Sequence, residues 1–207
     1  FAMQRLLQGD VGSGKTVVAT IVTLIAIQGG YQVAFMVPTE ILARQHYSVV
    51  SRQLLGVKGD LKVGLLISSI NKKEKEKLYK EIEEGKIDLV IGTHALIEES
   101  VRFKNPGLIV IDEQHKFGVG QRALLPAKGT NPDILIMIAT PITRTLAITL
   151  FGDLDVSIIN ELPPGRIAVK TMHFTQDNKR SAYEIAKEQL RLGCQAYIVY
   201  PVIEESY

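Results

Sequence analysis

The chain has 207 residues, of which 46% are hydrophobic, and its 24 basic residues nearly balance 22 acidic ones to give a formal net charge of +2. This length suits one domain with a buried sheet plus a remainder, and the charge excludes a protein that holds nucleic acid through a global positive field. The single cysteine, Cys194, excludes an internal disulfide and is expected to be buried, while the lack of an apolar span or signal sequence predicts a cytoplasmic protein without membrane contact.

Hydrophobic segments of strand-like and helix-like length alternate along the chain. The expected strands cover residues 4–7, 32–37, 62–67, 88–91, 108–111, 134–138 and 156–159. The expected helices cover residues 15–28, 39–54, 72–84, 120–125 and 144–150. Such alternation implies right-handed crossovers and an α/β fold, in which helices cover both faces of a mostly parallel sheet.

The turn between strand 4–7 and helix 15–28 is a complete Walker A phosphate loop. Its residues are Gly9, Asp10, Val11, Gly12, Ser13, Gly14, Lys15 and Thr16. The glycines allow successive N–H groups to point at one anion. The N-terminus of the following helix adds partial positive charge, and we expect this helix to be buried. We expect Lys15 to reach the β and γ phosphates of ATP and the Thr16 hydroxyl to ligate Mg²⁺. A glycine-rich turn that matches by chance is the alternative, which the flanking strand and helix disfavour.

A run of charges at residues 71–84 has the lysine content of a nucleic-acid patch. Its lysines are interleaved with glutamates, pairs such as Glu76 and Lys80 fall at helical spacing, and Leu78 with Ile82 forms an inner apolar stripe. We therefore expect a solvent-exposed helix at this position rather than a binding site.

Two adjacent carboxylates follow the apolar run 108–111, in the tetrapeptide Asp112-Glu113-Gln114-His115. Ligands of open α/β sheets bind outside the carboxyl ends of strands, which is where these carboxylates fall. We expect Asp112 to hold Mg²⁺, directly or through water, and Glu113 to be the base that orients and deprotonates the attacking water. Gln114 and His115 either link the γ-phosphate to another part of the protein or cap the element.

The paired prolines near residue 163 interrupt the alternation, because proline resists both helix and central strand. We expect a first domain at residues 1–160, an interdomain linker at 161–167, and an incomplete second domain at 168–207. The second would contain a strand at 168–174, a helix at 179–192 and a strand at 196–202.

These motifs together resemble the first motor domain of superfamily 2 helicases, and specifically the RecG family of bacterial branch-migration helicases. The resemblance is carried by residues 5–16, 34–43, 91–97, 110–119, 139–142, 151–155 and 161–166. It covers nearly the whole chain, and Gln114 is a fairly specific mark of the family. Transcription-repair coupling factor and primosomal helicase are similar, with glutamate at that position, and are the alternatives.

The resemblance implies a RecA-like P-loop fold and an ATP-dependent DNA helicase or translocase acting on branched DNA, in fork reversal and Holliday junction migration during repair and recombination. It also implies that Thr140 couples ATP hydrolysis to strand movement, although Ile138 stands where the family often has a hydroxyl. The implied DNA contacts are Pro38, Thr39, Arg44, Thr93, His94 and Arg144. The expected partners are DNA and further domains of the same protein, in a monomer.

Two other classes of P-loop protein are compatible with part of this pattern. A small-molecule kinase or transporter ATPase would need a substrate lid or a transporter signature, which the sequence lacks. A non-catalytic nucleic-acid scaffold would not need Lys15 and Glu113. Because the resemblance places an arginine finger in the second motor domain, we expect this polypeptide alone to bind ATP weakly and to unwind nothing.

Overall fold

The computed structural model describes residues 2–55, 61–112, 128–129, 131–139, 154–161 and 169–199. The chain divides into two compact units, Phe1–Pro164 and Gly165–Tyr207. The strands of the first unit are β1 (Gln4–Gly9), β2 (Gln32–Met36), β3 (Val63–Leu66), β4 (Leu89–Gly92), β5 (Pro106–Asp112), β6 (Asp133–Ile138) and β7 (Asp155–Ile159). Its described helices are α1 (Lys15–Gln28), α2 (Glu40–Leu54), α3 (Lys72–Glu83) and the short 3-10 helix η1 (His94–Ile97).

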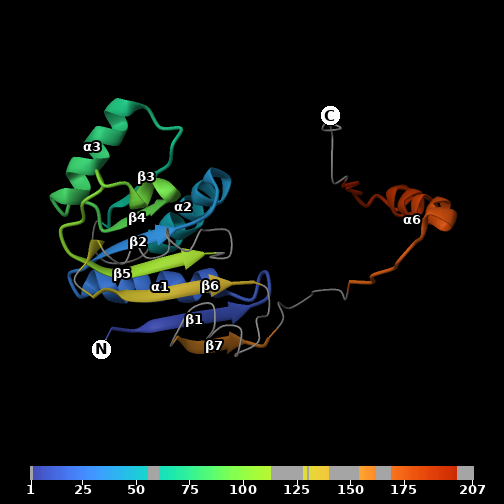
Figure 1. Ribbon diagram of the computed structural model, residues 1–207, viewed down its shortest axis with the longest axis horizontal. Helices are drawn as coiled ribbons and strands as arrows, with labels where there is room; N and C mark the ends of the chain where they lie inside the picture. Colours follow the sequence, from blue (N-terminus) through green and yellow to red (C-terminus); the bar gives the residue numbers. More distant parts are fainter. Residues whose placement is uncertain are drawn as a thin grey trace. The chain divides into compact units, whose positions relative to one another are not determined.

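The strands form one seven-stranded sheet in the order β3-β4-β2-β5-β6-β1-β7. Every pairing between neighbouring strands is parallel, so all the strands point in the same direction and end at one edge of the sheet (Figure 1). This confirms the predicted α/β fold with a parallel sheet. The helices predicted at 120–125 and 144–150 lie outside the described residues.

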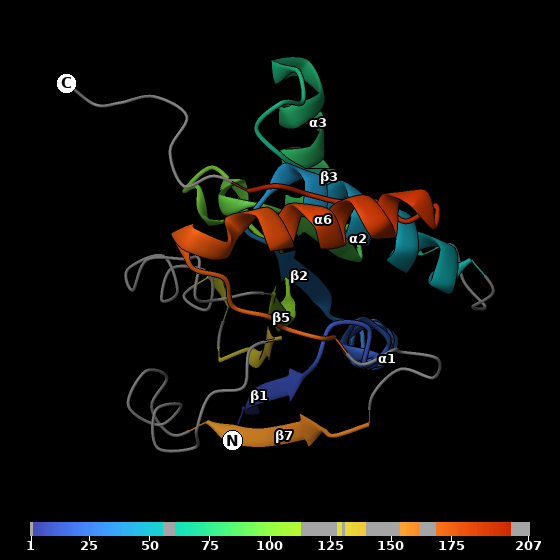
Figure 2. The same ribbon diagram turned by 90° about the vertical axis from the view of Figure 1, so that its right-hand side faces the viewer.

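Side chains that alternate along the strands build a separate core on each face of the sheet. Val33 and Phe35 of β2 belong to the cluster that includes buried residues of α1 and α2. Ala34 and Met36 belong to the opposite cluster, with Ile82 of α3. Figure 2 shows α1 and α2 on the same side of the strands. Burial on both faces explains why β2 is a continuous apolar run instead of an alternating one.

Helix α1 is only partly buried, so the prediction of a buried helix is wrong for its outer face. Its buried residues are Ala19, Thr20 and Thr23, whereas Ile21 and Ile25 are 54% and 61% exposed. Small side chains on the inner face allow the helix backbone to approach the sheet closely. Within the described ranges, no helix combines the length and the apolar character that a bilayer crossing requires.

The charge-rich segment forms α3, which confirms the predicted helix and its inner apolar stripe. Ile82 is fully buried and Leu78 packs against the same core cluster. Glu76 lies 4.0 Å from Lys72, however, and is not paired with Lys80 as predicted. Ion pairs as exposed as this one contribute little to stability, so the buried apolar stripe is what holds α3 on the sheet.

The second unit contains α6 (Lys179–Arg191), which confirms the helix predicted at 179–192, preceded by the 3-10 helix η4 (Gln176–Asn178). The strands predicted at 168–174 and 196–202 are wrong where the structure describes them, since residues 169–174 and 196–199 are not in strands. An isolated extended segment leaves its backbone groups unpaired.

Side-chain burial in the second unit also differs from expectation. None of the residues of α6 is buried, and Val169 and Val199 are 80% and 88% exposed. Cys194, which we expected to be buried, is a free and exposed cysteine. The described part of this unit therefore provides no apolar interior in which a small thiol side chain would be buried.

Candidate nucleotide-binding site

Strand register brings the two predicted motifs to the same part of the sheet edge. β6 separates β1 from β5, with Gln8 of β1 level with Ile138 and Asp112 of β5 level with Met137. Because neighbouring strands are about 4.8 Å apart, the phosphate loop that follows β1 begins roughly 10 Å from Asp112. This separation accommodates one metal-bound triphosphate between the loop and the carboxylate.

The phosphate loop presents unpaired donors at the start of α1. Gly14 is the N-cap of this helix, with a left-handed φ of 98° and no side-chain capping hydrogen bond. The N–H groups of Lys15 and Thr16 precede the first backbone hydrogen bonds of α1, which Val17 and Val18 donate to the Gly14 carbonyl. These two N–H groups and the helix dipole favour an anion here. The Ser13 hydroxyl oxygen is buried without a hydrogen-bond partner. An anion with several acceptor oxygens, such as a phosphate, fits these donors.

Lys15 holds its ammonium group inside the loop. Its Nζ donates to the carbonyl oxygens of Gly9 and Asp10, at 2.6 and 2.9 Å. A side chain at Gly9 would disturb this arrangement, since a Cβ atom there would be 2.5 Å from the Ser13 Oγ. A larger residue at position 9 would therefore require the Ser13 side chain to move.

A cavity of about 420 Å³ joins the two motifs. Its walls include Val11, Gly12, Lys15 and Thr16 from the phosphate loop, Asp112 from the end of β5, and Ala139 from the end of β6. Lys15, Thr16 and Asp112 are the residues expected to hold the phosphates and Mg²⁺. The chemistry of this set fits a magnesium nucleotide, because Mg²⁺ is bound through one or two carboxylates together with substrate phosphates.

Helix α2 supplies residues that we did not predict at this site. Gln45 and His46 line the same cavity, and the His46 Nε2 lies 3.1 Å from the Asp112 Oδ2. His46 follows Ala43 and precedes Val50 on the buried stripe of α2. A histidine within an otherwise apolar helical stripe is the sequence signal that would have identified it.

Several predicted residues lie outside the described part of the chain. They are Glu113, Gln114, His115, Thr140 and Arg144. The chain positions of two of them are still informative, because Asp112 immediately precedes Glu113 and Ala139 immediately precedes Thr140. Both neighbours line the cavity.

Four of the predicted nucleic-acid contacts follow two neighbouring strands at the same sheet edge. Pro38 and Thr39 follow β2, and Thr93 and His94 follow β4, its parallel neighbour, with Met36 level with Gly92. Thr39 caps α2 by accepting a hydrogen bond from the Leu42 N–H at 3.3 Å. Thr93 is only 1% exposed, and its hydroxyl is unpaired. His94 is exposed, and is therefore the more accessible member of this turn.

Arg44 lies on the exposed face of α2, as expected, next to a serine that we did not predict. It donates from Nη2 to the Ser69 Oγ at 3.2 Å, and the Ser69 N–H donates to Glu40 Oε1 at 3.0 Å. The Ser69 hydroxyl also donates to Glu40 and holds the pKa of this carboxyl below its ordinary value. Arg44 thus has an anionic neighbour with which a phosphate would compete.

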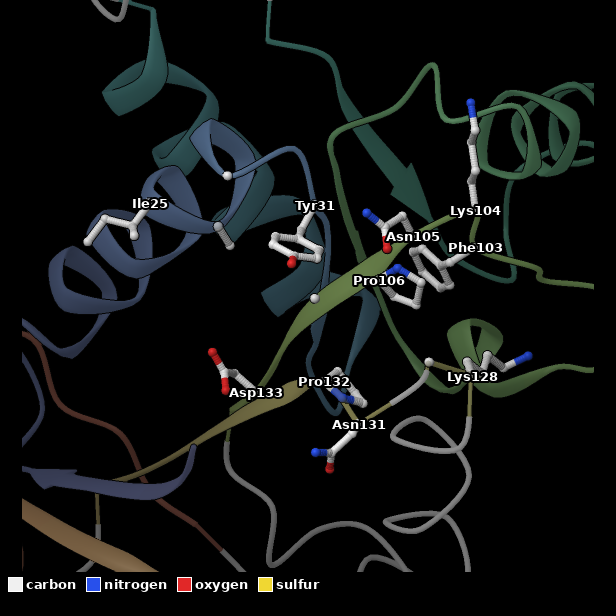
Figure 3. A pocket seen from close by; sticks show the side chains of 14 residues that line it. Ile25, Tyr31, Phe103, Lys104, Asn105, Pro106, Lys128, Asn131, Pro132 and Asp133 are labelled. Atoms are coloured by element: carbon white, nitrogen blue, oxygen red, sulfur yellow. The ribbon is translucent and has the colours of Figure 1, made fainter. Parts of the chain in front are cut away.

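A larger cavity, of about 810 Å³, lies at the opposite edge of the sheet, where β2, β5 and β6 begin. Figure 3 shows its side chains, with the ring of Tyr31 between α1 and the strand that begins at Pro106. Neither the phosphate loop nor Asp112 lines it. Because open α/β sheets bind ligands at the carboxyl ends of their strands, the smaller cavity is the candidate site despite its size.

Replacing Gly14 with alanine is expected to weaken nucleotide binding by about tenfold, which is about 1.4 kcal/mol. Gly14 and Gly30 both have left-handed φ angles, of 98° and 83°, and a Cβ atom at either would meet nothing within 4 Å. Both substitutions therefore share a backbone cost of about 1–2 kcal/mol in stability, but only the methyl group at Gly14 would enter the space of the anion. Titration with a fluorescent nucleotide would check this. Equal affinities of Gly14→Ala and Gly30→Ala would contradict it.

Comparison with known proteins agrees with this geometry. A family model described as DEAD/DEAH box helicase matches residues 2–149. ATP-dependent DNA helicase RecG of Aquifex aeolicus is 52% identical over 99% of this chain, which spans 26% of that protein. The RecG of Bacillus subtilis is also 52% identical over the full chain, which spans 30% of it.

Solved structures give the same result. A structure of RecG bound to a three-way DNA junction matches 98% of this chain and 27% of its own, with 49% identity and a TM-score of 0.79. The helicase MrfA bound to DNA and AMPPNP, at 18% identity and a TM-score of 0.68, shares the fold. The predicted resemblance to RecG and to RecA-like helicases is confirmed. The chain belongs to the DEAD/DEAH box helicase family.

Proposed function

We propose that this chain is the nucleotide-binding motor portion of an ATP-dependent DNA helicase that acts on branched DNA, in fork reversal and Holliday junction migration during repair and recombination. The observation that carries the proposal is the cavity shared by Lys15, Thr16 and Asp112. The similarity to proteins named ATP-dependent DNA helicase RecG favours this activity over transcription-repair coupling factor and primosomal helicase.

Different residues of the chain would bind the phosphates and the metal ion. Lys15 and the N–H groups at the start of α1 would hold the β and γ phosphates of ATP, and Thr16 with Asp112 would hold Mg²⁺. Bound Mg²⁺ offsets negative charge on the phosphate oxygens. Glu113, directly after Asp112, would orient the attacking water and accept its proton.

DNA would lie along the same sheet edge, next to the nucleotide. Thr39 and Arg44 on α2 and His94 after β4 are the accessible candidates for backbone phosphate contacts. The RecG structure bound to a three-way DNA junction supports branched DNA as the partner. Thr93 would contribute through its backbone, because its side chain is buried.

This motor portion would work together with further domains of the same protein. The chain spans 26% to 30% of the RecG proteins from Aquifex aeolicus and Bacillus subtilis, so its partners would include further domains. We place a first domain at residues 1–160, a linker at 161–167 and the start of a second motor domain at 168–207. A cytoplasmic monomer suits an enzyme that acts on chromosomal DNA.

Replacing Glu113 with glutamine in the intact protein is expected to retain nucleotide binding while DNA-stimulated ATP turnover falls by at least about 100-fold, as for the loss of a general base. The measurement is steady-state ATP hydrolysis with and without forked DNA. Glu99→Gln, at an exposed glutamate after η1, is the matched control and should behave as wild type. Wild-type turnover that forked DNA fails to stimulate would contradict the proposed function, whereas full turnover in Glu113→Gln would contradict only the role of Glu113.

A further inference from the structure

Asp112 has one protein partner that the proposed nucleotide chemistry does not use. His46 of α2 lies with its Nε2 3.1 Å from the Asp112 Oδ2, and the two side chains are 11% and 12% exposed. The contact joins residues 66 positions apart in the sequence. A buried polar group without a hydrogen-bond partner is costly, so this contact gives the largely buried Asp112 carboxyl group a partner within the fold.

Packing against the core fixes the direction of the His46 ring. The ring lies against Phe35 of β2, with centroids 5.0 Å apart and planes tilted by 38°. Phe35 is fully buried, as are Ala43 and Val50 on either side of His46 along α2. The imidazole therefore has little freedom to turn, and its Nε2 remains directed at the end of β5.

A donor fixed in this way limits the orientations of the carboxylate. His46 contacts Oδ2, so rotation of the Asp112 carboxyl group would break the contact, and Oδ1 is left outside it. Groups that hydrogen-bond to metal-binding residues orient them, and their loss typically weakens metal affinity by about 10–100-fold.

Helix α2 also contacts α1, the helix that follows the phosphate loop. Seven residues after His46, and thus on the same helical face, the Gln53 Oε1 lies 2.8 Å from the Thr20 hydroxyl. The same hydroxyl oxygen lies 2.8 Å from the carbonyl oxygen of Thr16. Helix α2 therefore contacts Asp112 directly and is linked to the backbone of Thr16 through the Thr20 hydroxyl.

We propose that His46 is a positioning residue, which donates its Nε2–H to Asp112 and holds this carboxylate in the orientation that Mg²⁺ requires. The proposal rests on the proposed nucleotide site. It predicts that His46 determines how tightly Mg²⁺ binds with the nucleotide, while nucleotide contacts made without the metal are independent of it.

The test is a Mg²⁺ titration of the intact protein with a fluorescent, non-hydrolysable ATP analogue. His46→Phe keeps a ring against Phe35 but removes the donor, and His46→Gln keeps an N–H donor. We expect His46→Phe to raise the half-saturating Mg²⁺ concentration about tenfold, and His46→Gln to remain within about threefold of wild type. Binding in the presence of a chelator should be equal in all variants. The matched control is His173→Phe, at an exposed histidine in the second unit.

The results distinguish a failure of the proposed role of His46 from a failure of the proposed metal site. A wild-type Mg²⁺ curve for His46→Phe would overturn the proposal, and so would a His46→Gln variant as defective as His46→Phe, because packing alone would then explain the loss. Asp112→Asn should abolish the Mg²⁺ dependence. If wild-type nucleotide binding does not depend on Mg²⁺ and Asp112→Asn changes nothing, both the proposed metal site and the role of His46 fall.

Discussion

Replacing Lys15 with alanine is expected to lower ATP turnover by at least about 100-fold, the scale of losing one preorganised electrostatic contact to the reacting group. The Lys15 ammonium lies within hydrogen-bond distance of the Gly9 and Asp10 carbonyls, in the cavity that also contains Asp112. Lys15 is the one lysine or arginine among the described residues that line this cavity. Without it, no side-chain cation there would offset the negative charge of the γ-phosphate. Steady-state hydrolysis with forked DNA and nucleotide titration would measure the effect in the intact protein.

Lys104→Ala is the matched control, because Lys104 lines the larger cavity at the opposite sheet edge. This variant should hydrolyse ATP as wild type does. A loss of nucleotide binding in Lys104→Ala with little change in Lys15→Ala would contradict the proposed site. It would show that the nucleotide binds at the opposite edge, in the larger cavity.

Replacing Gln32 with leucine is expected to lower the melting temperature by about 6–12 °C, which corresponds to about 3 kcal/mol in a chain of this length. Gln32 is only 6% exposed. Its Nε2 donates to the Ile82 and Ile87 carbonyls, and its Oε1 accepts from the Lys104 and Asn105 N–H groups. Leucine would remove this partner from all four backbone groups, of which the Ile82 carbonyl keeps the Gly85 N–H as a donor. A group left buried without any partner costs about 1–3 kcal/mol.

Thermal unfolding followed by circular dichroism would measure this change, with Gln28→Leu, at an exposed glutamine of α1, as the control. Gln32 lies at the amino edge of the sheet, so nucleotide affinity well below the melting temperature should not change. A Gln32→Leu protein that melts within a degree or two of wild type would refute the assignment of this side chain as a buried junction between α3, β4 and β5.

The sequence was sufficient to predict most of the sheet, because central strands such as β4 and β5 are buried on both faces and appear as apolar runs. It was also sufficient to bring Lys15 and Asp112 together, since parallel strands end at one edge. The position of β6 between β1 and β5 could not be predicted in this way. It joins strands far apart in the chain, and no local pattern encodes it.

The contacts that sequence reasoning missed are those that depend on tertiary packing. His46 and Gln32 are polar residues in buried positions, and their partners are 50 to 73 positions away in the sequence. The prediction that α1 is buried failed on its outer face. The sequence shows that residues such as Ile21 are apolar, but it does not show whether another part of the protein covers them. The strand predicted at 168–174 failed because periodicity suggests a strand but does not supply the partner strand.

The most direct test of the shared site is a crystal structure of the intact protein with Mg²⁺ and a non-hydrolysable ATP analogue. Our account predicts a triphosphate over Gly12, Gly14 and Lys15, with the metal held between Thr16 and Asp112 directly or through water. A nucleotide beside Tyr31 at the opposite edge, or a metal with no contact to Asp112, would contradict it.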